Sequence, residues 1–133
     1  MEQIAGLRHA GYEVVINLLP MMHDKAMENE AETVRENGMR YEQIPVVWTK
    51  PAQEDITRFF AVMDECAQQN RRVFVHCAVN MRASAFLYLW RTLHGGVDVD
   101  DAEADLHDVW VPEGWWAEFI ADVTRTQQGR GTV

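Results

Sequence analysis

Cysteine is scarce in this sequence: among 133 residues there are only two, Cys66 and Cys77, too few for a domain held together by disulfides. Long apolar runs are missing as well, and none approaches the roughly 20 residues that a helix needs to span a bilayer. The first residues, Met1-Glu2-Gln3, contain neither a basic stretch nor a leader-like apolar run. We therefore predict a cytoplasmic protein, without a membrane as partner, in which both thiols stay reduced.

Basic residues are also few. The sequence has 12 Lys and Arg against 21 Asp and Glu, a net charge of −9. Such a surface repels the phosphates of nucleic acids, and no basic cluster along the chain reverses that effect, so we expect no nucleic-acid partner. A small-anion site in so acidic a chain needs a compact group of donors, made of backbone N–H groups and an arginine.

Glycine and proline are sparse, with 8 and 4 residues, and the chain contains no internal repeat, low-complexity tract or interior linker. Hydrophobic residues make up 47% of the sequence, which excludes intrinsic disorder. A chain of this length buries about two-thirds of its unfolded surface in one core. We expect a single domain over residues 1–133, with a frayed tail over 127–133.

Apolar runs typical of buried strands alternate with segments of helical periodicity. Residues 12–19 are nearly all apolar, which is typical of a parallel strand covered on both faces. The other expected elements are strands over 41–47 and 72–76, and helices over 2–10, 24–36, 84–93, 100–107, 115–126 and from Pro51 onward. This alternation predicts an α/β fold, with a mostly parallel central sheet flanked by helices on both faces. In such sheets ligands bind outside the carboxyl ends of the strands.

The segment His76-Cys77-Ala78-Val79-Asn80-Met81-Arg82-Ala83-Ser84 connects the last predicted strand to a strongly apolar helix. The amino end of that helix offers unpaired N–H groups and a partial positive charge. Arg82 adds a guanidinium that can bind an oxyanion through two hydrogen bonds. Both effects favour the thiolate form of Cys77, which suits covalent catalysis; the alternative is an inert cysteine at a strand end. The expected anion-binding loop consists of Ala78, Val79, Asn80, Met81 and Arg82.

This segment resembles the signature loop of the cysteine-based protein tyrosine and dual-specificity phosphatases, His-Cys-x-x-Gly-x-x-Arg-Ser/Thr. The resemblance spans about residues 2–94 and points to a bacterial phosphatase-like family whose domains also occur fused to β-lactamase-like hydrolases. Family members usually carry a further N-terminal strand, which we expect to be absent here. The other short matches, in the order in which that family has them, are Ala10-Gly11-Tyr12, Val15-Ile16-Asn17-Leu18, Ile44-Pro45-Val46, and Pro51 with Glu54-Asp55.

The resemblance implies a catalytic role for Cys77, with Arg82 and Asp55, and supporting roles for His76 and Ser84. Cys77 matches the nucleophile, which attacks phosphorus and forms a cysteinyl-phosphate that water later hydrolyses. His76 matches the histidine that braces the loop; the alternative, a histidine hydrogen-bonded in the sheet, barely differs from it, since the family's histidine is itself structural. Ser84 matches the hydroxyl that bonds the sulfur, with a serine capping its own helix as the alternative. The implied partner is a phosphorylated protein or a small phosphate ester, with no cofactor and no metal.

Two departures concern the loop itself. Asn80 stands at the family's glycine position, and asparagine tolerates the positive φ of a tight loop. Arg82 lies five residues after Cys77, where the family has six, and Ala83 occupies the family's arginine position. Either the loop is one residue shorter, or the guanidinium enters from the previous helical position, a rotation of about 100° around the helix.

The general acid is the weakest match. These phosphatases place an aspartate after the Ile-Pro-Val strand, but residues 46–50 contain none. Asp55 is our candidate acid, with Asp24 as a second, against the alternative that Glu54 and Asp55 are favourable charges in the first turn of a helix. Loss of an acid typically costs about 10²–10⁴-fold in rate.

Two other functions stay open. The spacing Cys-x-x-Asn-x-Arg also resembles the six-residue loop of rhodanese-type sulfurtransferases, which would use a Cys77 persulfide and need no aspartic acid. A catalytically silent domain that binds an anion or a partner is the second. We assign no metal site, because the histidines outside the loop share no ligand spacing. Trp110, Trp115 and Trp116 are expected in the core, or as a partner surface if exposed.

Overall fold

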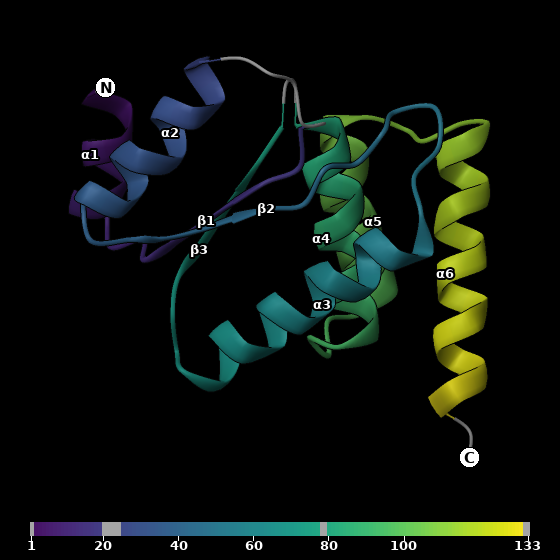
Figure 1. The fold of residues 1–133 in the computed structure, drawn as a ribbon. Coiled ribbons are helices and arrows are strands. Elements are labelled where there is room, and N and C mark those ends of the chain that lie inside the picture. Colours follow the sequence, from purple (N-terminus) through teal and green to yellow (C-terminus); the bar gives the residue numbers. More distant parts are fainter. Residues whose placement is uncertain (1, 20–24, 78–79, 132–133) are drawn as a thin grey trace.

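The computed structural model describes residues 2–19, 25–77 and 80–131 of the chain. Its centre is a sheet of three parallel strands in the order β2-β1-β3 (Figure 1). The strands are β1 (Val14–Asn17), β2 (Arg40–Gln43) and β3 (Val73–His76). Val14 pairs in register with Arg40 on one side and with Val73 on the other. The α/β fold and the parallel sheet predicted from the sequence are confirmed.

Helices cover both faces of the sheet, also as predicted (Figure 1). One face carries the first two helices, the third, fourth and sixth share the core cluster on the other face, and the fifth packs against the fourth. The helices are α1 (Glu2–His9), α2 (Lys25–Glu36), α3 (Gln53–Gln68), α4 (Met81–Leu93), α5 (Val99–Val109) and α6 (Trp115–Gly131). None of the helices in the described part of the chain has the length and apolar character needed to cross a bilayer.

The core has two parts because side chains of a strand alternate between its faces. Val14 and Ile16 enter the larger cluster, formed with α3, α4 and α6, whereas Val15 enters a smaller one with Val34 and Met39. In the larger cluster Phe86 of α4 lies between rings of α3 and α6, with Phe59 at 5.4 Å and Phe119 at 5.9 Å between ring centroids. Aromatic packing therefore fixes α4, the helix that follows the candidate site.

Several element bounds differ from the sequence predictions. Strand β2 ends at Gln43, although Ile44 N–H donates to the Asn17 carbonyl at 2.9 Å and Val46 N–H donates to the Leu18 carbonyl at 3.0 Å, so hydrogen bonds to the β1 segment continue past the end of the strand. Helix α4 begins at Met81, three residues earlier than predicted. Helix α6 runs to Gly131, so most of the segment expected as a frayed tail continues the last helix.

The fold brings five chain segments to one edge of the molecule (Figure 1). The carboxyl ends of β1 and β3 lie there with the amino end of α4, at the upper side of the view. The connections over 44–52 and 110–114 reach the same edge, where the rings of Trp48 and Trp110 are 5.4 Å apart between centroids. This is the edge at which an α/β sheet is expected to bind a ligand.

Candidate active site

Cys77 directly follows β3, on the same face of the sheet as Val73 and Val75. The side chain belongs to the larger core cluster and is only 8% exposed. Its Sγ accepts a hydrogen bond from the backbone N–H of Ala83 at 3.4 Å. The sulfur therefore lies against the first turn of α4, where N–H groups without helical partners and the positive end of the helix stabilise a negative charge.

Asn80 makes the tight turn into α4. Its φ of 64° is left-handed, as the family's glycine position in the signature loop requires, and asparagine is one of the few residues that tolerates it. Ala83, six residues after Cys77, is the residue whose N–H contacts the sulfur. Ala83 stands at the family's arginine position, so the backbone of that position contacts the sulfur; which of the two loop arrangements holds stays a prediction. Ala78 and Val79, expected in the anion-binding loop, lie outside the described residues.

The guanidinium of Arg82 packs on an indole that the sequence analysis missed. Its Cζ lies 5.3 Å from the centroid of the Trp48 ring, within the range of a cation–π contact. Its Nε is buried and has no hydrogen-bond partner among the described residues. An unpaired buried donor costs about 1–3 kcal/mol, more when charged, so this N–H is suited to an anionic acceptor.

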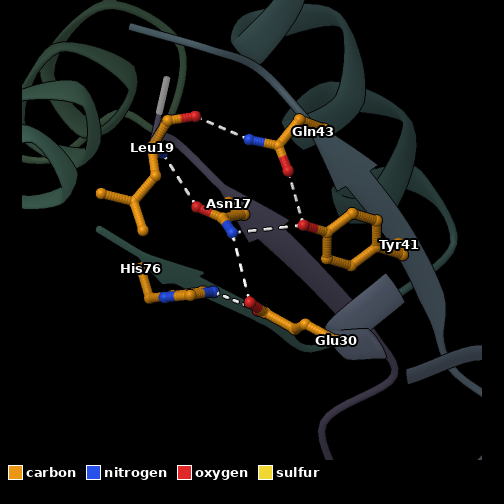
Figure 2. A network of polar contacts seen from close by, with 6 residues as sticks. All are labelled: Asn17, Leu19, Glu30, Tyr41, Gln43 and His76. Carbon is orange, nitrogen blue, oxygen red and sulfur yellow. Dashed lines mark hydrogen bonds and ion pairs between the residues drawn. The ribbon is translucent and has the colours of Figure 1, made fainter. Parts of the chain in front are cut away.

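His76 precedes Cys77 but lies on the opposite face of the sheet, because neighbouring strand residues alternate. Its Nε2 contacts Oε1 of Glu30, in α2, at 2.5 Å (Figure 2), and its ring stacks on Phe74 at 5.8 Å between centroids. This contact suits a structural histidine, as both readings of His76 suppose. Any bracing of the loop by this contact acts through the backbone of β3.

Glu30 belongs to a polar network that sequence reasoning did not find (Figure 2). Asn17 is fully buried; its side-chain amide donates to Tyr41 Oη at 3.2 Å and accepts from the Leu19 N–H at 2.9 Å. Tyr41 Oη donates to Gln43 Oε1 at 2.6 Å, and Gln43 donates to the Leu19 carbonyl at 2.6 Å. Burial raises the pKa of Tyr41, so its hydroxyl stays protonated as a donor. The network ties the carboxyl ends of β1 and β2 to α2.

The hydroxyl of Ser84 does not make the contact with sulfur that the resemblance implies. Its Oγ donates to the Met81 carbonyl at 2.8 Å and accepts from Trp110 Nε1 at 3.0 Å. The hydroxyl proton is therefore donated within the first turn of α4. This arrangement is close to the alternative prediction, in which the serine bonds the backbone of its own helix. Trp110, which comes from the α5–α6 connection, covers this turn.

Comparison with known proteins identifies the family. A family model described as "DSP-PTPase phosphatase fused to NAD+ Kinase" matches residues 1–113. A solved structure of a candidate phosphatase (DUF442) from Shewanella putrefaciens CN-32 is 34% identical, with a TM-score of 0.80, 95% of this chain and 82% of that chain covered. The chain belongs to this DSP-PTPase family. It is thus one of the cysteine-based phosphatase folds that its signature segment resembles.

More distant structures share the fold. TpbA of P. aeruginosa, solved in complex with pTyr, is 14% identical with a TM-score of 0.69, covering 99% of this chain and 81% of that one. The core catalytic domain of a PP-IP phosphatase from S. cerevisiae, solved with citrate, is 13% identical with a TM-score of 0.66, covering 96% and 81%. A search among curated proteins returned no match.

The candidate general acid, Asp55, is engaged within its own helix. Asp55 is the third residue of α3, and its Oδ2 accepts from the Ala52 N–H at 3.3 Å. This contact caps its own helix, as the alternative reading of Asp55 supposes. Glu54 is exposed, and Asp24 lies outside the described residues. The role of Asp55 in proton transfer stays a prediction.

The electrostatic state of Asp55 gives a pH-dependent prediction. Burial raises its pKa, against the opposing effect of the Ala52 hydrogen bond. The pKa of Asp55 is therefore higher in the folded chain than in the unfolded chain. As the pH rises from the unfolded pKa through the folded pKa, ionisation of Asp55 lowers the free energy of unfolding. Asp55→Asn, which keeps an acceptor oxygen but cannot ionise, is expected to gain stability relative to the native chain between about pH 3.5 and about pH 7. Urea denaturation at both pH values measures this difference; a difference that stays constant or shrinks with pH would contradict it.

Proposed function

We propose that this chain is a cysteine-dependent, phosphatase-like hydrolase of phosphomonoesters. The observation that carries the proposal is the hydrogen bond from Ala83 N–H to Cys77 Sγ, at the point where a buried parallel strand meets the amino end of α4. A sulfur in that position is a nucleophile held beside donors for an oxyanion. Membership of the DSP-PTPase family supports the same chemistry.

The proposed reaction has two steps. The Cys77 thiolate attacks phosphorus, the bond from phosphorus to the ester oxygen breaks, and the leaving oxygen takes up a proton. Water then attacks the cysteinyl-phosphate, the sulfur–phosphorus bond breaks, and inorganic phosphate leaves with the thiolate restored. Backbone N–H groups of the loop and the Arg82 guanidinium would bind the phosphoryl oxygens in both steps.

Protonation of the leaving oxygen is assigned to Asp55. Burial raises the pKa of this carboxyl, which favours the protonated form that a general acid needs. Because its Oδ2 also caps α3, donation to a substrate requires the other oxygen or a break in that cap. We therefore expect slow turnover of esters with poor leaving groups and faster turnover of activated aryl esters.

The substrate class follows from the site and from its relatives. TpbA was solved with pTyr, and the S. cerevisiae neighbour is a PP-IP phosphatase. Those neighbours support a phosphate ester, carried by a protein or a small molecule, as the substrate of this chain. The cytoplasmic location predicted from the sequence remains a prediction.

The sulfurtransferase reading is the second candidate, favoured by the five-residue separation of Cys77 and Arg82. Against it, the N–H that reaches the sulfur belongs to Ala83, six residues on, which supports a loop of phosphatase length. The one observation that favours a silent anion-binding domain is that Asp55, the candidate general acid, caps its own helix.

Three assays on the purified chain separate these functions. Hydrolysis of an aryl phosphate supports the proposal, whereas cyanide-dependent formation of thiocyanate from thiosulfate supports a sulfurtransferase. Silence in both assays, with sulfate binding retained in a thermal shift experiment, supports the silent domain and overturns the proposal. Iodoacetate should also label Cys77 faster at neutral pH than an ordinary exposed thiol. Equal labelling rates would remove the basis for a nucleophilic sulfur.

A further inference from the structure

A groove lined by four of the chain's five tryptophans opens beside the candidate active site. Its volume is about 650 Å³, and its main lining residues are Trp48, Trp110, Trp115, Trp116, Glu113 and Glu118. The rings form one cluster, with Trp48 lying 5.4 Å from Trp110 and 5.3 Å from Trp116 between centroids. Trp115 is 59% exposed, so one indole stands at the surface of the groove.

Two contacts connect this groove to the amino end of α4. The Arg82 guanidinium lies over Trp48, and the Trp110 indole donates to the Ser84 hydroxyl. Both Arg82 and Ser84 lie in the first turn of α4, the turn whose Ala83 N–H contacts the sulfur of Cys77. A ligand in the groove would therefore lie next to a phosphate held at the loop.

The chemistry of the groove favours a cation. The face of an indole carries negative charge and attracts ammonium and guanidinium groups, and Arg82 over Trp48 is an example within the molecule. Glu113 and Glu118 add two exposed carboxylates, and neither forms an ion pair within the described residues. Indole faces with unpaired carboxylates are complementary to lysine or arginine side chains.

The size and surroundings of the groove favour a polypeptide as the bearer of that cation. A volume of about 650 Å³ exceeds what one ammonium group fills, and exposed apolar side chains, Val111 and Trp115, continue the surface. The chain's net charge of −9 also repels a phosphate dianion. Basic residues beside the phosphorylated residue would offset that repulsion.

We propose that this groove binds lysine or arginine side chains of a polypeptide substrate, close to its phosphorylated residue. The phosphate part of this statement rests on the proposed function. The recognition of basic side chains rests only on the tryptophans and the two glutamates, so the two parts can be tested separately.

The first experiment needs no catalysis. Binding of an unphosphorylated, lysine- and arginine-rich peptide is measured by calorimetry against the same peptide with norleucine and glutamine at the basic positions. We expect the basic peptide to bind about 3- to 30-fold more tightly. Trp115→Ala and the double variant Glu113→Gln/Glu118→Gln should each remove most of this difference. The double variant Asp100→Asn/Asp101→Asn, which removes two exposed carboxylates from the first turn of α5, is the charge-matched control and should leave this difference unchanged.

The second experiment uses phosphopeptides with the same basic or neutral flanks. KM should be lower for the basic peptide, and Trp115→Ala should raise that KM while leaving kcat and the KM of a small aryl phosphate unchanged. If no phosphopeptide is hydrolysed but the basic peptide still binds selectively, the proposed function fails and the groove assignment holds. If phosphopeptides are hydrolysed and the neutral peptide binds as tightly as the basic one, the groove assignment is overturned.

Discussion

Cys77→Ser is expected to lower aryl phosphate hydrolysis by at least about 10³-fold, to the uncatalysed background. A serine hydroxyl stays protonated at neutral pH, so the variant keeps the shape of the site but lacks the attacking anion. The substitution is nearly isosteric because it only exchanges sulfur for oxygen, in a side chain that is 8% exposed and accepts a hydrogen bond from the Ala83 N–H. Steady-state rates with excess substrate measure the effect.

Cys66→Ser provides the matched control. Cys66 is buried in α3 at 1% exposure, and burial raises the pKa of its thiol, which makes it a poor nucleophile. This variant should keep the native rate, provided that circular dichroism shows it folded. Hydrolysis that survives Cys77→Ser at more than a tenth of the native rate would mean that the sulfur is not the nucleophile.

Arg82→Ala is expected to lower kcat/KM for an aryl phosphate by about 10²–10³-fold, the usual loss when one donor to a developing negative charge is removed. Arg82→Lys should recover only part of the loss, because an ammonium keeps the charge but not the two-pronged donor geometry or the planar packing on Trp48. Sulfate binding, followed by thermal shift, should weaken in the same order as activity.

Arg91→Ala is the control for the arginine prediction. Arg91 is on the same helix, but it forms a surface ion pair with Asp105 at 2.8 Å. Arg91 lies in the last turn of α4, away from the amino end that holds the site, so its loss should leave kcat/KM and sulfate binding unchanged. The fold should also be kept, since exposed ion pairs contribute little to stability. Normal activity and sulfate affinity in Arg82→Ala would show that the guanidinium over Trp48 faces away from the anion site.

The sequence predicts the framework of this fold because its signals are local. The run containing Val14 and Ile16 identifies a buried strand, and the stripe containing Phe59 identifies the core face of α3. The strand–turn–helix around Cys77 is equally local. The hydrogen bond to the sulfur is not predictable in this way, because the Cys-x4-Arg spacing alone does not say which N–H reaches Cys77; the left-handed Asn80 and the Ala83 contact come from the structure.

Contacts between distant segments account for most of what the sequence did not predict. Trp48 and Arg82 are separated by 34 positions, and no periodicity links them. The pairing of Glu30 with His76 likewise depends on how α2 packs on the sheet. One signal was available: residues 76 and 77 have opposite strand parity, which places His76 and Cys77 on different faces. For Ser84 the family resemblance implied a hydrogen bond to the sulfur. In the structure its hydroxyl instead bonds the Met81 carbonyl and the Trp110 indole.

The opposite orientation of His76 and Cys77 has a mechanical consequence. Glu30 holds the histidine from α2, while the next residue carries the sulfur toward α4. A shift of α2 along the sheet would therefore move His76, and with it the backbone next to Cys77. The two faces of the sheet would be coupled through the backbone alone. Loosening of the smaller cluster around Val34 would then be transmitted to the sulfur as a change in its position.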